Sequence, residues 1–275
     1  MPFIQTGGKE LYYTWSQAKT TGEQPGLTLL FLHGLGSSSS FYATIIPRLL
    51  EAGLSCLAVD TYGSGLSKFT GQDQDTRTIA QDARHLLSTL GVDPGRTVVV
   101  GHSMGCIVAS ELASDGNFAG MVLLGAINPD PKYHAAFGKR IETVKAQGME
   151  AMANTIPTAA TGSRSNSVHH AFIRALLLSQ TSGGYVSLCN AIVSARRPDY
   201  ARIRCPVLVV AGEEDKTASL GDAKAIIASL GTDPTAVQLE ILPGVGHWHC
   251  IEGADEVGAL VTEFGRRITT TIIQN

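Results

Sequence analysis

Short runs of aliphatic residues alternate along this chain with longer segments of helical periodicity. Runs rich in Val, Ile and Leu predict buried strands at 27–33, 54–60, 97–102, 119–127, 206–212 and 236–242. Helical spacing of apolar residues predicts helices over 41–53, 75–91, 104–114, 219–231 and 253–268. Uninterrupted apolar strands that alternate with helices are typical of a parallel sheet covered by helices on both faces. The sequence therefore predicts an α/β protein with a mostly parallel, doubly wound sheet.

The alternation stops between the strands at 119–127 and 206–212. This stretch opens with the turn sequence NPDP and then shows helical spacing without a clear buried strand. Helices are predicted here over 139–154, 167–178 and 184–196. We interpret the stretch as a helical cap inserted into the sheet domain. The expected organisation is a first part of the core at 1–127, the cap at 128–204 and a second part of the core at 205–275.

The charge pattern excludes several classes of function. The chain of 275 residues has a formal net charge of −3 and no basic stripe, which argues against nucleic-acid binding. The sequence contains no run of 18 consecutive apolar residues, so no membrane span is predicted. The N-terminus lacks the apolar core of a signal peptide. We expect a cytoplasmic protein with a small-molecule substrate, no nucleic-acid or membrane partner and no metal, and we allow for a homodimer.

The strongest chemical signal is the sequence GHSMG at 101–105, which lies between a predicted strand and a predicted helix. In this setting the pattern G-x-S-x-G predicts a sharp turn that exposes a serine hydroxyl, here that of Ser103. Glycines on both sides give the backbone the room that such a turn requires. Ser103 is therefore the candidate nucleophile.

A serine nucleophile requires a base and a residue that orients this base. Glu213, Glu214 and Asp215 follow the strand at 206–212, and we assign the orienting role to Asp215, which lies deepest in the loop. His247 and His249 follow the last strand, and we assign the base to His247, directly after the glycines. The order Ser, Asp, His along the chain is that of the α/β-hydrolases.

Backbone N–H groups are expected to stabilise the oxyanion of the reaction. The sequence HGLGS begins at His33, directly after the first predicted strand, and its glycines allow the backbone to turn toward the reacting carbonyl. The expected donors are the N–H of Leu35 and that of Met104, the residue after the nucleophile. We expect His33 itself to hold this loop by hydrogen bonds.

Five stretches together resemble the α/β-hydrolase superfamily over nearly the whole chain. They are HGLGSS (33–38), DTYGSGLS (60–67), GHSMG (101–105), GEEDKT (212–217) and GHWHCIE (246–252). The resemblance implies an α/β-hydrolase fold with the helical cap inserted after the sixth strand. Within the superfamily, the stretch 183–217 is similar to 3-oxoadipate enol-lactone hydrolases and their carboxylesterase relatives. Tyr62 stands where that family often has an arginine.

The resemblance and the candidate residues together imply a cofactor-free serine hydrolase that cleaves a small ester or lactone through an acyl-enzyme. The residues expected to contact the substrate are His102, Trp248, Phe172 and Arg174. Two alternatives use the same fold: a receptor similar to those for butenolide hormones, which turns over slowly, and a haloperoxidase-like or perhydrolase-like enzyme that accepts peroxide.

Overall fold

The computed structural model describes residues 2–19 and 26–274 of the chain. Within them, eight strands form one sheet in the order β1-β2-β4-β3-β5-β6-β7-β8. The strands are β1 (Phe3–Thr6), β2 (Lys9–Ser16), β3 (Thr28–Leu32), β4 (Ser55–Val59), β5 (Thr97–His102), β6 (Gly120–Leu124), β7 (Val207–Gly212) and β8 (Val237–Leu242). β1 and β2 pair antiparallel, β2 joins β4 antiparallel, and every later pairing is parallel. This confirms the predicted α/β class with a mostly parallel sheet.

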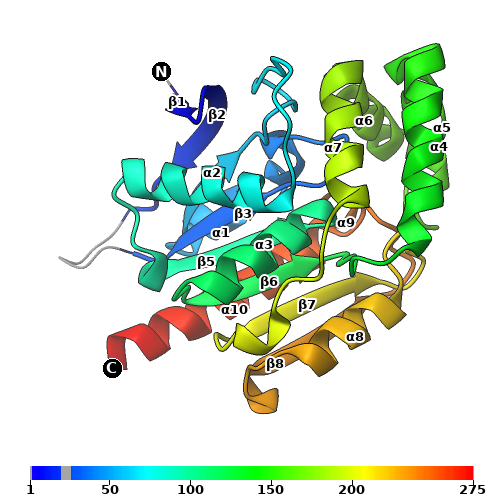
Figure 1. Cartoon of the computed structure of the whole chain (residues 1–275). Coiled ribbons are helices and arrows are strands. Elements are labelled where there is room, and N and C mark those ends of the chain that lie inside the picture. The colour runs from blue at the N-terminus through cyan, green and yellow to red at the C-terminus, as the bar shows by residue number, and fades with distance from the viewer. Residues whose placement is uncertain (1, 20–25, 275) are drawn as a thin grey trace.

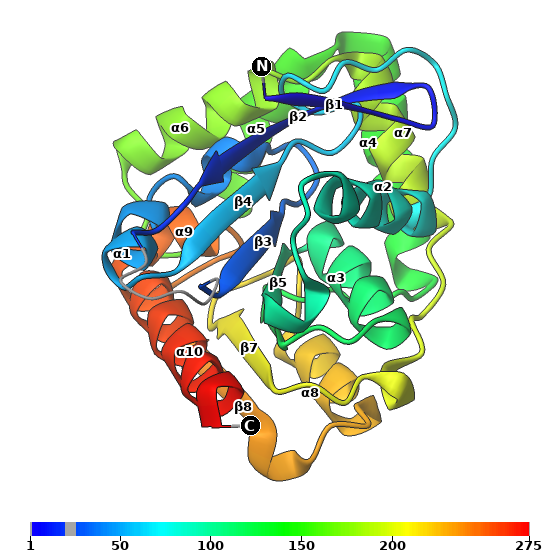
Figure 2. The same ribbon diagram turned by 90° about the vertical axis from the view of Figure 1, so that its left-hand side faces the viewer.

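Helices cover both faces of the sheet (Figures 1 and 2). Figure 2 shows α1 and α10 on one side of the strands and α2, α3 and α8 on the other. Their bounds are α1 (Ile46–Glu51), α2 (Thr76–Thr89), α3 (Met104–Asp115), α8 (Leu220–Ser229) and α10 (Ala254–Gln274), and the short α9 spans His249–Glu252. The middle strands are buried throughout and mostly apolar, because helices exclude water from both of their faces.

Four further helices lie in the chain between β6 and β7. They are α4 (Lys132–Gln147), α5 (Met149–Ala159), α6 (Ser167–Leu178) and α7 (Ser182–Val193), and Figure 1 shows them grouped together at one side of the sheet. Among them, α4 packs against α5 and α7, and α5 packs against α6. We call these four helices and their connections the cap.

Three predicted helices differ from the observed ones by more than three residues. The segment predicted as a helix over 41–53 begins in a short 3₁₀ turn, Ser39–Tyr42, and continues into α1, which begins beside Pro47 because proline is well tolerated in the first turn of a helix. The cap segment 139–154 is two helices, divided at Gly148, whose φ is +73°. The last helix continues to Gln274 rather than ending at 268.

The antiparallel strands β1 and β2 were not predicted. Gly7 and Gly8 join them, and both have positive φ, which is typical of a tight hairpin turn. Among the described residues, no helix has the length and apolar character needed to cross a membrane.

Candidate active site

Ser103 lies in the turn between β5 and α3 with a strained backbone. Its φ is +54° and its ψ is −115°, and within the described residues no other non-glycine residue has a positive φ. A Cβ on Gly101 would collide with the main chain of Gly105, and a Cβ on Gly105 would collide with the carbonyl of Leu32. The two glycines therefore allow the tight approach of strand and helix that holds the serine in this conformation.

The structure brings Ser103, His247 and Asp215 into one chain of hydrogen bonds. Nε2 of His247 lies 2.9 Å from Oγ of Ser103, and Nδ1 lies 2.8 Å from Oδ2 of Asp215. The three residues follow β5, β8 and β7, whose carboxyl ends share one edge of the parallel sheet. Because Nδ1 of His247 donates its proton to the carboxylate of Asp215, Nε2 of the same ring faces Ser103 as a proton acceptor.

The carboxylate of Asp215 is fixed and ionised. Its other oxygen, Oδ1, accepts hydrogen bonds from the backbone N–H groups of Thr217 and Ala218, each at 2.8 Å. Burial alone would raise the pKa of Asp215, but the charge and hydrogen bond of His247 outweigh burial and hold this pKa well below its usual value. An ionised carboxylate can orient the imidazole and stabilise its protonated form.

The alternative residues point elsewhere. The carboxylate of Glu213 accepts from the N–H of Gly244 at 3.0 Å, and that of Glu214 accepts from the N–H and hydroxyl of Ser163 at 2.8 and 2.6 Å. His249 places Nδ1 2.9 Å from the carbonyl oxygen of His247. Each of these three side chains thus has a hydrogen-bond partner other than Ser103.

The loop after β3 packs directly against the serine. A Cβ on Gly34 would lie 3.0 Å from Cβ of Ser103, so the loop approaches the nucleophile closely. His33 holds the loop, since its Nδ1 donates to the carbonyl of Gly34 at 2.8 Å and its Nε2 accepts from the N–H of Thr61 at 3.0 Å. Leu35 follows Gly34 in this loop.

Met104 is the first residue of α3 and directly follows the serine. The N–H groups of a first helical turn have no acceptor within the helix. Leu35 and Met104 thus lie on the two segments that flank Ser103, which is the arrangement required of paired oxyanion donors.

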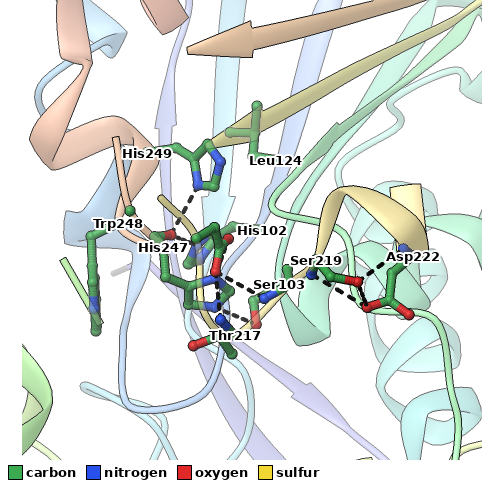
Figure 3. A network of polar contacts seen from close by, with 12 residues as sticks. His102, Ser103, Leu124, Thr217, Ser219, Asp222, His247, Trp248 and His249 are labelled. Atoms are coloured by element: carbon green, nitrogen blue, oxygen red, sulfur yellow. Dashed lines mark hydrogen bonds and ion pairs between the residues drawn. The ribbon is translucent and has the colours of Figure 1, made fainter. Parts of the chain in front are cut away.

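The four predicted substrate contacts lie in different surroundings. His102 is 2% exposed, stacks on Phe41 at 4.3 Å, and places Nε2 2.8 Å from the carbonyl oxygen of His247. Trp248 is also buried and meets Phe41 edge to face. Figure 3 shows His102, Trp248 and His249 in the surroundings of His247. Arg174 lies on the exposed face of α6, where its guanidinium donates to the side chain of Asn154 at 3.4 Å.

Phe172 lines a cavity of about 580 Å³ between α6 and the core. The cavity wall from the core includes Ser38, Ser39 and Ser40, which continue the loop after β3, and the polar side chain of Asp60. Phe172 therefore lies beside the end of the predicted oxyanion loop.

Sequence reasoning assigned no role to Glu252, although it ends the stretch GHWHCIE. Its carboxylate is buried and accepts three backbone N–H groups: Gly162 at 2.6 Å, Gly246 at 3.0 Å and Trp248 at 2.9 Å. Two of these donors flank His247 and the third belongs to the cap. An acid five residues after the base was the available signal, but its partners come from a distant segment.

Tyr62 contributes to a turn near the cap. Its buried hydroxyl oxygen accepts from the backbone N–H of Thr70 at 2.7 Å and from that of Gln72 at 3.2 Å. At the position where the resemblance implied an arginine, this chain thus has a tyrosine whose hydroxyl satisfies the backbone of the segment after β4.

In the part of the chain that the structure describes, no three His, Cys, Asp or Glu side chains are grouped so that they could hold a metal ion.

A family model for the alpha/beta hydrolase family matches residues 29–260, and the chain belongs to this family. Two Vibrio toxins named multifunctional-autoprocessing repeats-in-toxin are 33% identical over 128 residues, and the match spans only 2% and 3% of their length. A 2-(acetamidomethylene)succinate hydrolase from Mesorhizobium japonicum is 27% identical, over 81% of this chain and 82% of its own.

Solved structures share the fold. An enol-lactonase from Burkholderia xenovorans has a TM-score of 0.84 at 23% identity, with 96% of this chain and 99% of that chain covered. A thermophilic esterase from Thermogutta terrifontis has a TM-score of 0.83 at 22% identity, with 98% and 97% covered. These likenesses confirm the α/β-hydrolase fold.

Proposed function

We propose that this protein is a serine hydrolase that cleaves a small ester or lactone without a cofactor. The observation that carries the proposal is the continuous series of hydrogen bonds from Ser103 through His247 to Asp215. Membership in the alpha/beta hydrolase family supports hydrolysis as the class of reaction.

The geometry suggests the following steps. Oγ of Ser103 attacks the carbonyl carbon while Nε2 of His247 removes its proton, and the N–H groups of Leu35 and Met104 stabilise the oxyanion. The protonated imidazole, stabilised by Asp215, then donates its proton to the leaving alcohol, which leaves an acyl group on Ser103. Water, activated in turn by His247, attacks this acyl group and regenerates the serine.

A small substrate follows from how little of the site meets solvent. Ser103 is 6% exposed and His247 is 7% exposed, and the cap contacts both the His247 loop and the loop after β3. A site covered in this way encloses a compact substrate better than an extended chain. Short esters and lactones are therefore the proposed class.

The test compares the unaltered protein with Ser103→Ala on p-nitrophenyl acetate. Loss of the nucleophile should lower kcat by about 10³-fold or more while the fold is retained, as measured by circular dichroism. A serine-reactive phosphonate should label Ser103 and no other serine. Retained activity in Ser103→Ala would refute the proposal.

The same assay separates the two alternatives. A receptor-like protein would complete very few turnovers and would change its melting temperature on binding a butenolide. A haloperoxidase-like enzyme would require peroxide for its principal activity. Multiple turnovers of a short ester in water, without peroxide, would support hydrolysis.

A further inference from the structure

Two buried imidazoles share the main-chain carbonyl of the candidate base. Nε2 of His102 lies 2.8 Å from the carbonyl oxygen of His247, and Nδ1 of His249 lies 2.9 Å from the same atom (Figure 3). A carbonyl oxygen can only accept, so both nitrogens must carry a proton and donate it. The two rings come from different places in the fold, since His102 ends β5 and His249 begins α9.

Both rings are neutral donors at neutral pH. Burial lowers the pKa of His102 and that of His249. The imidazoles of His247 and His249 lower the pKa of His102 further and Asp215 opposes them, while Asp215 and Glu252 oppose the lowering at His249. Within the described residues, the second ring nitrogen of each, Nδ1 of His102 and Nε2 of His249, has no hydrogen-bond partner. Neither ring therefore adds a positive charge beside His247 when that imidazole becomes protonated.

Each ring is locked by its packing. His102 stacks on Phe41, and its ring centroid lies 5.0 Å from that of His247. His249 is fully buried against Gly125, where an added Cβ would lie 2.6 Å from Cε1 of the ring. Rings held in this way present their N–H groups in a fixed direction.

We propose that His102 and His249 are positioning residues that fix the main chain of His247, so that its imidazole reaches Ser103 and Asp215 at the same time. This inference rests on the proposed function. A shift of about 1 Å in a catalytic group costs about 10²-fold in rate. The N–H of His247 is fixed as well, since it donates to the carbonyl of Ala160 at 2.8 Å.

The shared acceptor predicts a characteristic dependence between the two histidines. When one donor is removed, the other still binds the carbonyl, so each single loss should lower kcat by about tenfold. When both are removed, the buried carbonyl has no donor and the loop can move. The double variant should therefore lose more than the product of the single losses, because residues with a common partner are not additive.

Conservative variants separate the effect of losing the hydrogen-bond donor from the effect of changing the side-chain volume. In His249→Asn the amide nitrogen can occupy the place of Nδ1, and in His102→Gln it can occupy the place of Nε2. The matched variants His249→Leu and His102→Leu keep an apolar side chain but remove the donor. We expect Asn and Gln to retain most of kcat and each Leu variant to lower kcat by about tenfold, with KM for p-nitrophenyl acetate changed by less than about threefold in all four.

The control is Thr262→Val, which removes a buried hydroxyl that donates to the carbonyl of Gly258 at 2.7 Å, far along the chain in α10. It should lower the melting temperature without lowering kcat. If the Leu variants behave like this control, or if Asn and Gln lose as much activity as Leu, the positioning role is refuted.

A second measurement does not depend on catalysis. The Nδ1 proton of His247, hydrogen-bonded to Asp215, should give a low-field ¹H resonance in the unaltered protein. This resonance should persist in His249→Asn and weaken or shift in the double Leu variant. If no ester is hydrolysed, the proposed function fails, and the resonance alone decides whether the two histidines position His247. An unchanged resonance in the double variant would overturn the proposal.

Discussion

Two of the borders between the cap and the core are built differently. At the first, which we call the tight border, residues 160–164 of the cap pack against residues 244–252 of the core, the segment that carries His247. Two backbone hydrogen bonds cross it, from His247 to Ala160 at 2.8 Å and from Arg164 to Gly244 at 3.1 Å. The buried carboxylate of Glu252 adds a third connection, because it binds the N–H of Gly162 and those of two residues beside His247.

At the second, which we call the open border, the C-terminal half of α6 and Ser179, which follows it, face Ser38–Ser40 across the cavity of about 580 Å³. An exposed apolar side chain lines it as well, since Leu66 is 54% exposed. One side-chain hydrogen bond, from Gln180 to the carbonyl of Ser37 at 3.0 Å, lies near it.

The difference indicates which part of the cap can move. Displacing the tight border would displace the base with it, whereas the open border can change without disturbing the triad. We therefore expect substrate to enter at the open border, with the tight border acting as part of the catalytic framework.

The largest effect is expected from Glu252→Ala. Three buried N–H groups would lose their acceptor, and each unsatisfied group costs about 1–3 kcal/mol, so the free energy of unfolding should fall by about 3 kcal/mol or more. Esterase activity should fall by about 10²-fold, because two of those groups flank His247. Urea denaturation and p-nitrophenyl acetate hydrolysis measure the two quantities.

The matched control is Glu256→Ala, since Glu256 reaches the same border through an exposed pair with Arg164 at 2.7 Å. An exposed ion pair is worth about 1 kcal/mol or less. Equal effects of the two substitutions would show that the tight border does not depend on the buried carboxylate.

A second prediction uses two glycines of the cap. A Cβ on Gly162 would lie 2.7 Å from the backbone nitrogen of Gly246 and would also collide with the carbonyl of Gly244. Gly162→Ala should therefore lower the free energy of unfolding by about 1–3 kcal/mol. Gly138, inside α4, has nothing within 4 Å of an added Cβ, so Gly138→Ala should stabilise by about 0.5–1 kcal/mol. The signs should be opposite in urea titrations, and a neutral Gly162→Ala would contradict the tight packing.

Acid should weaken the support behind the tight border. Burial lowers the pKa of His249 in the folded protein, so below its ordinary pKa of about 6.5 the unfolded chain binds a proton that the folded chain does not. Stability should then fall with decreasing pH by up to about 1.4 kcal/mol per unit for this ring. Between pH 7 and 5.5, the free energy of unfolding should fall less in His249→Asn than in the unaltered protein. Identical losses would show that folding does not lower the pKa of His249.

The features that could be predicted from the sequence are those that leave a pattern in neighbouring residues. Parallel strands and the serine turn leave signals within a few residues, and the chain order of Ser103, Asp215 and His247 follows from the carboxyl ends of parallel strands. Gly7 and Gly8 also carried a local signal for the N-terminal hairpin, between two segments rich in β-forming residues, and that signal was overlooked.

The supports of the base could not be predicted in this way. The contact between Gly162 and Gly246, and the donation from His102 to the carbonyl of His247, join residues about 80 and 145 positions apart. No periodicity reports a shared acceptor, since it depends on how the ends of separate strands meet in space. From the sequence, His249 was therefore only an alternative candidate for the base, although in the structure its ring lies against the main-chain carbonyl of His247.

The smallest effect is expected at the open border, in Phe172→Ala. Phe172 is only partly buried and lines the cavity, so its loss should lower the free energy of unfolding by about 1 kcal/mol, well below the cost of Glu252→Ala. If substrate enters beside this ring, the wider opening should favour longer acyl chains. The ratio of kcat/KM for p-nitrophenyl hexanoate to that for the acetate should rise about threefold, which is less than the roughly tenfold that one methylene is worth in an enclosed apolar pocket, because Phe172 is only partly buried. Arg174→Ala, on the outer face of the same helix, should leave the ratio unchanged. A ratio that responds to Arg174→Ala, or does not respond to Phe172→Ala, would place the entry elsewhere.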